Sequence, residues 1–107
     1  MSIEDNLRIV RLIDTYGVLL TSKKLAVISD YYFDNLTLSE IGENFGISRQ
    51  AVNDCITKAV KTLNDYEDKL KVIENYAVVK SQLESLKSNF TIEDDLNKIS
   101  KIIDMLN

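Results

Sequence analysis

The chain has 107 residues, 45% hydrophobic and 28% charged, which is typical of one globular domain or of a small domain with an appendage. The formal net charge of −4 argues against a protein that binds any polyanion, because such binding needs many cations against phosphates. The absence of histidine and the single cysteine exclude the common zinc sites, histidine-based catalysis and an internal disulfide, so we expect no metal and no other cofactor.

The first third of the chain predicts two amphipathic helices. Apolar residues spaced three and four apart define one face of the first helix, which weakens near Gly17 and ends around Leu20: Ile3, Leu7, Val10, Ile13 and Tyr16, with Ile9 and Leu12 beside them. Thr21 or Ser22 can cap the second helix, which ends before the Asp-Asn pair at 34–35. Its predicted buried stripe is Leu25, Ile28, Tyr32 and Phe33.

The stretch "LSEIGENFGISRQAVNDC" at 38–55 has the pattern of a helix-turn-helix. Thr37 and Glu40 form a capping box, and a third helix is predicted to run from there to about Phe45. Gly46 suits the left-handed corner between the two helices, and Ser48 can cap the fourth helix. The positions expected to face inward are Ile41, Phe45, Ile47, Ala51, Val52, Cys55, Ile56, Ala59 and Leu63, with Gly42 at the close approach.

The opposite face of the fourth helix carries six candidate nucleic-acid contacts: Arg49, Gln50, Asn53, Thr57, Lys58 and Lys61. Arginine can make two hydrogen bonds to guanine, glutamine or asparagine can do so to adenine, and lysine suits phosphate. Asp54 repels phosphate unless it accepts from a cytosine amine or pairs with Lys58. A solvated polar face explains the same residues, so both interpretations stay open at this point.

Other conspicuous side chains are expected to be structural. Cys55 is expected to be a small buried residue. The tyrosines at helical spacing are expected to be core residues with their hydroxyls at the rim: Tyr31, Tyr32, Tyr66 and Tyr76. The sequence therefore indicates no reactive thiol.

The last third of the chain predicts two more helical segments. The apolar repeat loses a residue near 74–76, which indicates a stammer or a break, and resumes up to Phe90. Thr91 can cap a final helix with a coiled-coil-like seam: Ile92, Leu96, Ile99, Ile103 and Leu106. Because two heptads are not stable alone, this helix must pack on residues 76–90, on the helix-turn-helix head at residues 1–64, or on a second copy of the chain.

Residues 19–70 resemble the YlxM-like family of small bacterial helix-turn-helix proteins, which is itself similar to region 4 of sigma factors. The resemblance rests on "LLT" at 19–21, "YY" at 31–32, "LTLSEI" at 36–41, "GISRQAV" at 46–52 and "DYEDKL" at 65–70. It implies an all-α, winged-helix-superfamily-like fold without strands, and a role in the signal recognition particle pathway. Members commonly have their gene beside that of the particle's GTPase.

These observations predict a helix-turn-helix head at residues 1–64 and a helical extension at 65–107 that forms a dimer or docks a partner. We expect a regulatory protein rather than an enzyme, since no phosphate-cradling loop or acid pair is present. Its partner is DNA or the signal recognition particle RNA, whereas the alternatives are a transcription regulator or a module that docks the particle's GTPase. The absence of a long apolar stretch and of a basic leader favours the cytoplasm over a membrane.

Overall fold

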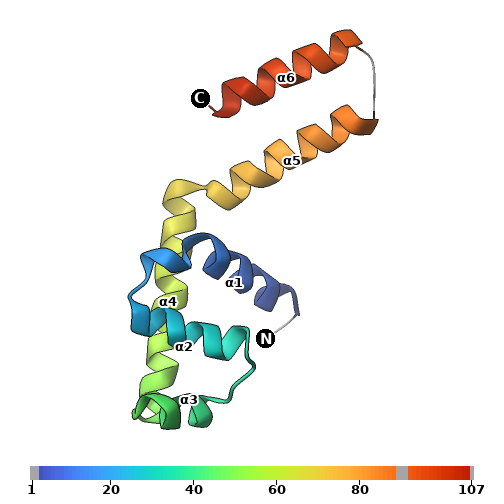
Figure 1. Cartoon of the computed structure of the whole chain (residues 1–107). Helices are drawn as coiled ribbons and strands as arrows, with labels where there is room; N and C mark the ends of the chain where they lie inside the picture. Colours follow the sequence, from blue (N-terminus) through green and yellow to red (C-terminus); the bar gives the residue numbers. More distant parts are fainter. Residues whose placement is uncertain (1–2, 89–91, 107) are drawn as a thin grey trace. The chain divides into compact units, whose positions relative to one another are not determined.

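The computed structural model describes residues 3–88 and 92–106, and all regular structure in these ranges is helical. The fold is all-α, as the sequence predicts. The elements in chain order are α1 (Ile3–Tyr16), a 3₁₀ turn η1 (Gly17–Leu19), α2 (Ser22–Tyr32), α3 (Leu38–Phe45), α4 (Arg49–Leu70), α5 (Val72–Ser88) and α6 (Ile92–Leu106) (Figure 1). The chain divides into two compact units at the junction of Lys71 and Val72. The predicted division at 64–65 falls inside α4, which continues unbroken to Leu70.

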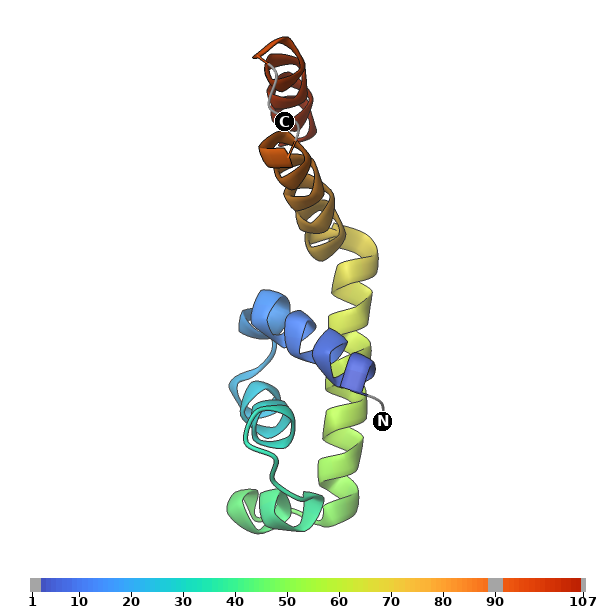
Figure 2. The ribbon, with the colours of Figure 1, turned by 90° about the vertical axis from the view of Figure 1, so that its right-hand side faces the viewer.

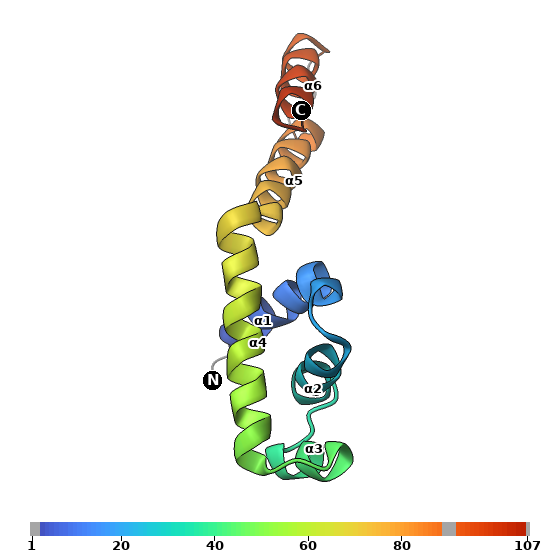
Figure 3. The same cartoon turned by 90° about the vertical axis from the view of Figure 1, so that its left-hand side faces the viewer.

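The first unit is built against α4. In Figure 2, α2 and α3 lie along one side of α4 and α1 crosses it, and Figure 3 shows α3 beside the beginning of α4. The largest completely buried side chains come from all four helices: Leu12, Val27, Ile28, Ile41, Val52 and Leu63. Burial of each such side chain contributes about 1.5–3 kcal/mol, so this shared core fixes the helices that present the candidate contacts.

The buried face of α1 is rotated from the predicted one. Leu7 is 59% exposed, whereas Ile9, Leu12, Ile13 and Tyr16 are buried. Two apolar stripes overlap in this short helix, so spacing alone could not select the stripe that contacts α4.

An aromatic contact and two hydrogen bonds join α1 to the second half of α4. The Tyr16 hydroxyl donates to Glu67 Oε1 at 2.5 Å, and its ring stacks on Tyr66 at a centroid distance of 5.9 Å. Near the other end of α1, Arg8 Nη1 donates to Asn64 Oδ1 at 2.6 Å. These contacts hold α1 across α4.

The turn between α3 and α4 has the predicted chemistry. The Thr37 hydroxyl accepts from the Glu40 amide while the Glu40 carboxylate accepts from the Thr37 amide, which completes the capping box. Gly46 is left-handed at φ 67°, and the Ser48 hydroxyl accepts from the Ala51 amide to begin α4. A methyl group on Gly42 would lie only 2.7 Å from the Ile47 carbonyl oxygen. Gly42 therefore permits the close approach that the motif requires.

Substitution of Gly46 by alanine is expected to lower the free energy of unfolding by about 1 kcal/mol, because left-handed backbone costs an L-residue roughly 1–2 kcal/mol. A Cβ atom at this position would meet nothing within 4 Å, so the cost is conformational and not steric. Urea denaturation measures the change. Gly46→Asn is the control, since asparagine tolerates this conformation and should cost less; an equal or larger loss for asparagine would contradict the explanation.

Ile56 is buried as predicted, but some other side chains of the first unit are less buried than the sequence suggests. Cys55 and Ala51 are only partly buried, and Phe33 is 47% exposed. Cys55 still packs against the cluster of Val27, Ile41, Val52 and Ile56. The inward arc of α4 is thus centred nearer Val52 and Ile56 than on Cys55.

The break after α4 occurs at Lys71 rather than near 74–76, so that prediction was wrong. Lys71 is left-handed at φ 55°, and its amide donates to the Glu67 carbonyl at 2.9 Å. Lysine rarely adopts this conformation, and no glycine or proline marks the position, so the sequence carried no local signal.

In the second unit, α5 packs against α6, but not through the predicted seam. The seam residues with described side chains are exposed: Leu96 62%, Ile99 46%, Ile103 52% and Leu106 71%. Ile102 is buried in their place, and Tyr76, predicted to be a core residue, is 69% exposed. Phe90 and Thr91 lie outside the described residues. The heptad pattern therefore marks a face that α5 does not cover.

Among the described residues, no helix is long and apolar enough to cross a membrane.

Candidate nucleic-acid interface

All six candidate contacts lie on the exposed surface of α4. Within this 22-residue helix their positions fall on one half of the circumference, opposite the buried residues Val52, Ala59 and Leu63. One stripe contains Arg49, Asn53 and Thr57, and the neighbouring stripe contains Gln50, Lys58 and Lys61. We call these six residues the α4 polar face.

Hydrogen bonds within α4 occupy part of this face. Gln50 Nε2 donates to Asp54 Oδ1 at 3.4 Å, and the Thr57 hydroxyl donates to the Asn53 carbonyl at 2.9 Å. Asp54 thus accepts from Gln50 and not from Lys58, whose pairing with Asp54 was one of the alternatives that the sequence left open. The hydroxyl of Thr57 already serves the helix backbone, which leaves its methyl group and second lone pair for a ligand.

The other four side chains of the α4 polar face make no hydrogen bond or ion pair within the part of the chain that the structure describes. Within residues 3–88 and 92–106, no hydrogen bond or ion pair involves the side chains of Arg49, Asn53, Lys58 or Lys61. A guanidinium, an amide and two ammonium groups are therefore available on one rigid helix surface. These are the groups that contact base edges and phosphates in protein–DNA complexes.

Arg8 extends the basic surface in a way that the sequence did not reveal. Its hydrogen bond to Asn64 places this α1 side chain one helical turn beyond Lys61 on α4. Arg11 follows on the exposed side of α1. Because Arg8 and Lys61 are 53 positions apart in sequence, only the packing of α1 on α4 brings them together.

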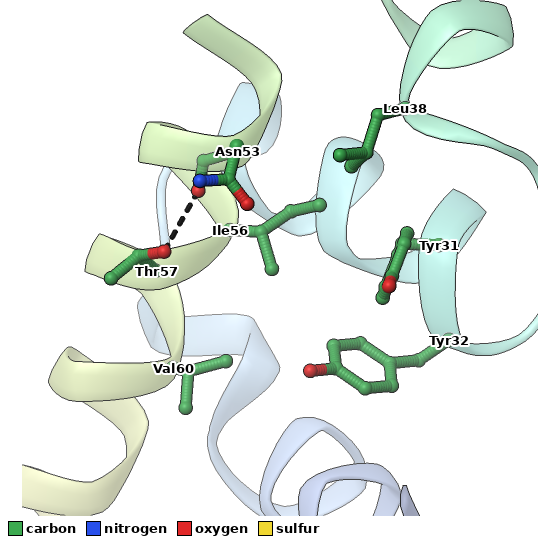
Figure 4. A pocket seen from close by; sticks show the side chains of 7 residues that line it. All are labelled: Tyr31, Tyr32, Leu38, Asn53, Ile56, Thr57 and Val60. Carbon is green, nitrogen blue, oxygen red and sulfur yellow. Dashed lines mark hydrogen bonds between the residues drawn. The ribbon is translucent and has the colours of Figure 1, made fainter. Parts of the chain in front are cut away.

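Tyr31 and Tyr32 line two hollows beside the α4 polar face, which contributes Asn53 and Thr57 to one hollow and Arg49 to the other. The smaller hollow, about 250 Å³, is lined by Tyr31, Tyr32, Leu38, Asn53, Ile56, Thr57 and Val60 (Figure 4). A second hollow of about 490 Å³ shares Tyr31, Tyr32 and Leu38 and adds Asn6, Asn35, Leu36, Thr37 and Arg49. Sequence reasoning placed both tyrosines in the core, but they are only partly buried. Their helical spacing beside apolar residues gave no sign of this.

The two tyrosine rings contact each other edge to face. Their centroids are 5.0 Å apart with an interplanar angle of 83°. Burial, together with the neighbouring Tyr31, raises the pKa of Tyr32 above its ordinary value of 10. The Tyr32 hydroxyl therefore stays protonated, and able to donate, throughout the physiological pH range.

Within the described residues, no group of three or more His, Cys, Asp or Glu side chains could hold a metal ion.

Comparison with known proteins gives a family match over nearly the whole chain. The family model UPF0122, described as "Putative helix-turn-helix protein, YlxM / p13 like", matches residues 3–103. Similar proteins include the UPF0122 protein YofM of Lactococcus lactis subsp. lactis, 42% identical over 96 residues that cover 90% of this chain and 86% of the relative. A UPF0122 protein of Fusobacterium nucleatum is 37% identical over 106 residues, or 99% of each chain. One from Malacoplasma penetrans is 45% identical over 78 residues, or 73% of each.

Proposed function

Because the chain belongs to the UPF0122 family of YlxM/p13-like helix-turn-helix proteins, we propose that it is a non-enzymatic regulatory protein that binds nucleic acid through the α4 polar face. The observation that carries the proposal is the row of exposed polar side chains on α4, four of which make no hydrogen bond or ion pair within the described residues, directly after the capped helix α3 and the left-handed corner at Gly46. Such a helix reads base edges when it enters a major groove. A solvated face explains the composition of this row but not its placement directly after the turn.

Each residue of the α4 polar face has a role in this proposal. Arg49, in the first turn of α4, contacts a guanine edge, and Asn53 one turn later contacts adenine. Gln50 and Thr57 make accessory contacts, since each already has a hydrogen bond within the helix. Lys58 and Lys61 neutralise phosphate farther along the backbone of the nucleic acid, where Arg8 adds a third cation.

We further propose that the protein acts in the cytoplasm, in the signal recognition particle pathway, with the particle RNA as its preferred nucleic acid. The support is the family resemblance. The test is fluorescence anisotropy with labelled particle RNA and a random DNA duplex of similar length at the same salt concentration. At least tenfold tighter binding of the RNA is expected. Equal affinity for the two would contradict this pathway and favour a general DNA-binding regulator.

The exposed hydrophobes of α5 and α6 favour a second function, docking of another protein. Of the fourteen exposed large hydrophobic side chains that the structure describes, nine lie in this second unit: Val72, Tyr76, Val78, Leu83, Leu96, Ile99, Ile103, Met105 and Leu106. Ile102, at 7% exposure, is the one buried large hydrophobe among the described residues of this unit. Two short helices with so little core gain stability by covering an apolar face with a partner.

Replacement of Leu96 and Ile103 together by aspartate is expected to weaken this docking at least tenfold, because two exposed apolar contacts become charged. Size-exclusion chromatography with light scattering measures it, first on the protein alone and then with the particle's GTPase. A mass of twice 12.2 kDa indicates a homodimer, and co-elution indicates the GTPase. Asp104→Asn is the control on the same helix. A wild-type protein that stays monomeric and does not co-elute with the GTPase would contradict both forms of docking.

A further inference from the structure

The smaller hollow beside the α4 polar face is open to solvent and lies between α2 and α3 on one side and α4 on the other. Figure 4 shows Tyr31, Tyr32 and Leu38 on one side and Asn53, Thr57 and Val60 of α4 on the other, with Ile56 between them. One side is aromatic, the floor is aliphatic, and the rim on α4 is polar. This combination suits a flat, mostly apolar heterocycle that carries hydrogen-bonding groups on one edge.

The tyrosine pair offers a fixed ring face for stacking. Because the rings meet at 83°, they are nearly perpendicular and not stacked, and Tyr32 covers at most one face of Tyr31. Both rings also pack against the cluster of Val27, Ile41, Val52 and Ile56, which restricts their movement. A preordered ring loses little rotational freedom when a ligand stacks on it.

The polar rim can recognise an edge of such a ligand. The Asn53 side-chain amide has one donor and one acceptor side and makes no hydrogen bond within the described residues. Arg49 lines the adjoining hollow, which shares Tyr31 and Tyr32 with the smaller one. The Arg49 guanidinium thus lies beside the position that the sugar and phosphate of a bound nucleotide would occupy.

The size of the hollow limits the ligand to about one ring system. Its volume of about 250 Å³ lies just below the roughly 300–1,000 Å³ of sites for drug-sized molecules. We therefore propose that the hollow between Tyr31 and Asn53 receives a single unpaired nucleobase from a single-stranded segment of RNA or DNA. This inference rests on the proposed function and deepens it, because a base within a stacked duplex cannot enter the hollow.

The test uses the full-length protein and two probes, a mixed-sequence single strand with one 2-aminopurine and a perfect duplex of the same length. Both RNA and DNA single strands are used. Tyr31→Leu keeps an apolar side chain against the core but removes the ring, and is expected to weaken single-strand binding by about 5- to 150-fold, the range for one stacked base. Quenching of 2-aminopurine should disappear, while duplex affinity stays within about twofold.

Three controls separate stacking from folding and from charge. Tyr31→Phe keeps the ring and should bind like the wild type. Phe33→Leu removes another exposed aromatic ring, one that lines neither hollow, and should leave single-strand affinity unchanged. Circular dichroism checks that Tyr31→Leu is folded. Unchanged single-strand affinity of folded Tyr31→Leu, with duplex binding intact, would overturn the inference alone. Failure of the wild type to bind either probe would overturn the proposed function and the inference with it.

Discussion

Replacement of Arg49 and Lys61 together by alanine is expected to weaken binding of the preferred nucleic acid roughly 100-fold. Loss of one two-pronged base contact costs about 1–3 kcal/mol, and loss of a phosphate contact weakens binding to all sequences. The two effects should add, because the side chains are three helical turns apart and neither makes a hydrogen bond or ion pair with the part of the chain that the structure describes. Fluorescence anisotropy at constant salt measures the change.

The matched control for this variant removes the same charge elsewhere. Lys80→Ala with Lys87→Ala deletes two exposed cations from α5, so the net charge changes equally while the α4 polar face stays intact. Affinity within about twofold of the wild type is expected, since neither lysine belongs to the α4 polar face and isolated exposed charges are screened by salt. If the two double variants weaken binding equally, net charge and not this face controls the interaction.

Gly42→Val is expected to give the largest loss of stability, about 3 kcal/mol or more, because overpacking in a rigid site costs 1–3 kcal/mol and occasionally more. Even the Cβ atom would lie 2.7 Å from the Ile47 carbonyl oxygen and 3.6 Å from the Arg49 amide nitrogen. These are backbone atoms of the turn and cannot rotate away as a flexible side chain would. Thermal denaturation measures the loss, at roughly 4–8 °C per kcal/mol for a domain of this size.

Two further variants identify the cause of this loss. Gly42→Ala should cost clearly less than Gly42→Val, since it adds the Cβ atom without the branches. Gly17→Ala is the matched control, because its Cβ would meet Leu25 Cδ1 and Ile13 Cγ2, which are side-chain atoms able to move. Equal stability of Gly42→Val and the wild type would mean that α3 and α4 do not need their close approach.

The turn that presents the α4 polar face could be predicted because its signals are local. A threonine followed three residues later by glutamate, a glycine after the helix and a serine before the next one each satisfy backbone groups within a few positions. Such interactions depend on neighbours in sequence, so the bounds of α3 and the beginning of α4 followed from the residues alone. The outward direction of the six candidate contacts then followed from helix geometry.

The features that escaped prediction depend on packing between distant segments. Leu7 and Ile9 are equally apolar, and only the position of α1 on α4 decides which of them is buried. In the same way, α5 covers Ile102 and leaves Ile103 exposed, contrary to the heptad pattern. Hydrophobic spacing defines which stripes exist on a helix but not which partner covers each stripe.

The hollow beside Tyr31 could not be found from the sequence for a related reason. Its lining comes from the end of α2, the beginning of α3 and the first three turns of α4. A tyrosine at helical spacing next to apolar residues is usually a core residue, and Tyr16, at 2% exposure, shows that ordinary case. Tyr66, which stacks on Tyr16, was also predicted to be a core residue but is only partly buried. Only the three-dimensional arrangement shows that Tyr31 and Tyr32 line a hollow.

The salt dependence of duplex binding tests the central claim most directly, because it counts the phosphates that the α4 polar face and Arg8 neutralise. Three to five phosphate contacts predict a slope of about −3 to −4.5 for the logarithm of the binding constant against the logarithm of salt concentration. Arg49→Ala with Lys61→Ala should make that slope about one unit shallower, because Lys61 is the phosphate contact of this pair. A wild-type slope near zero, or one that the double variant leaves unchanged, would contradict nucleic-acid binding by this face.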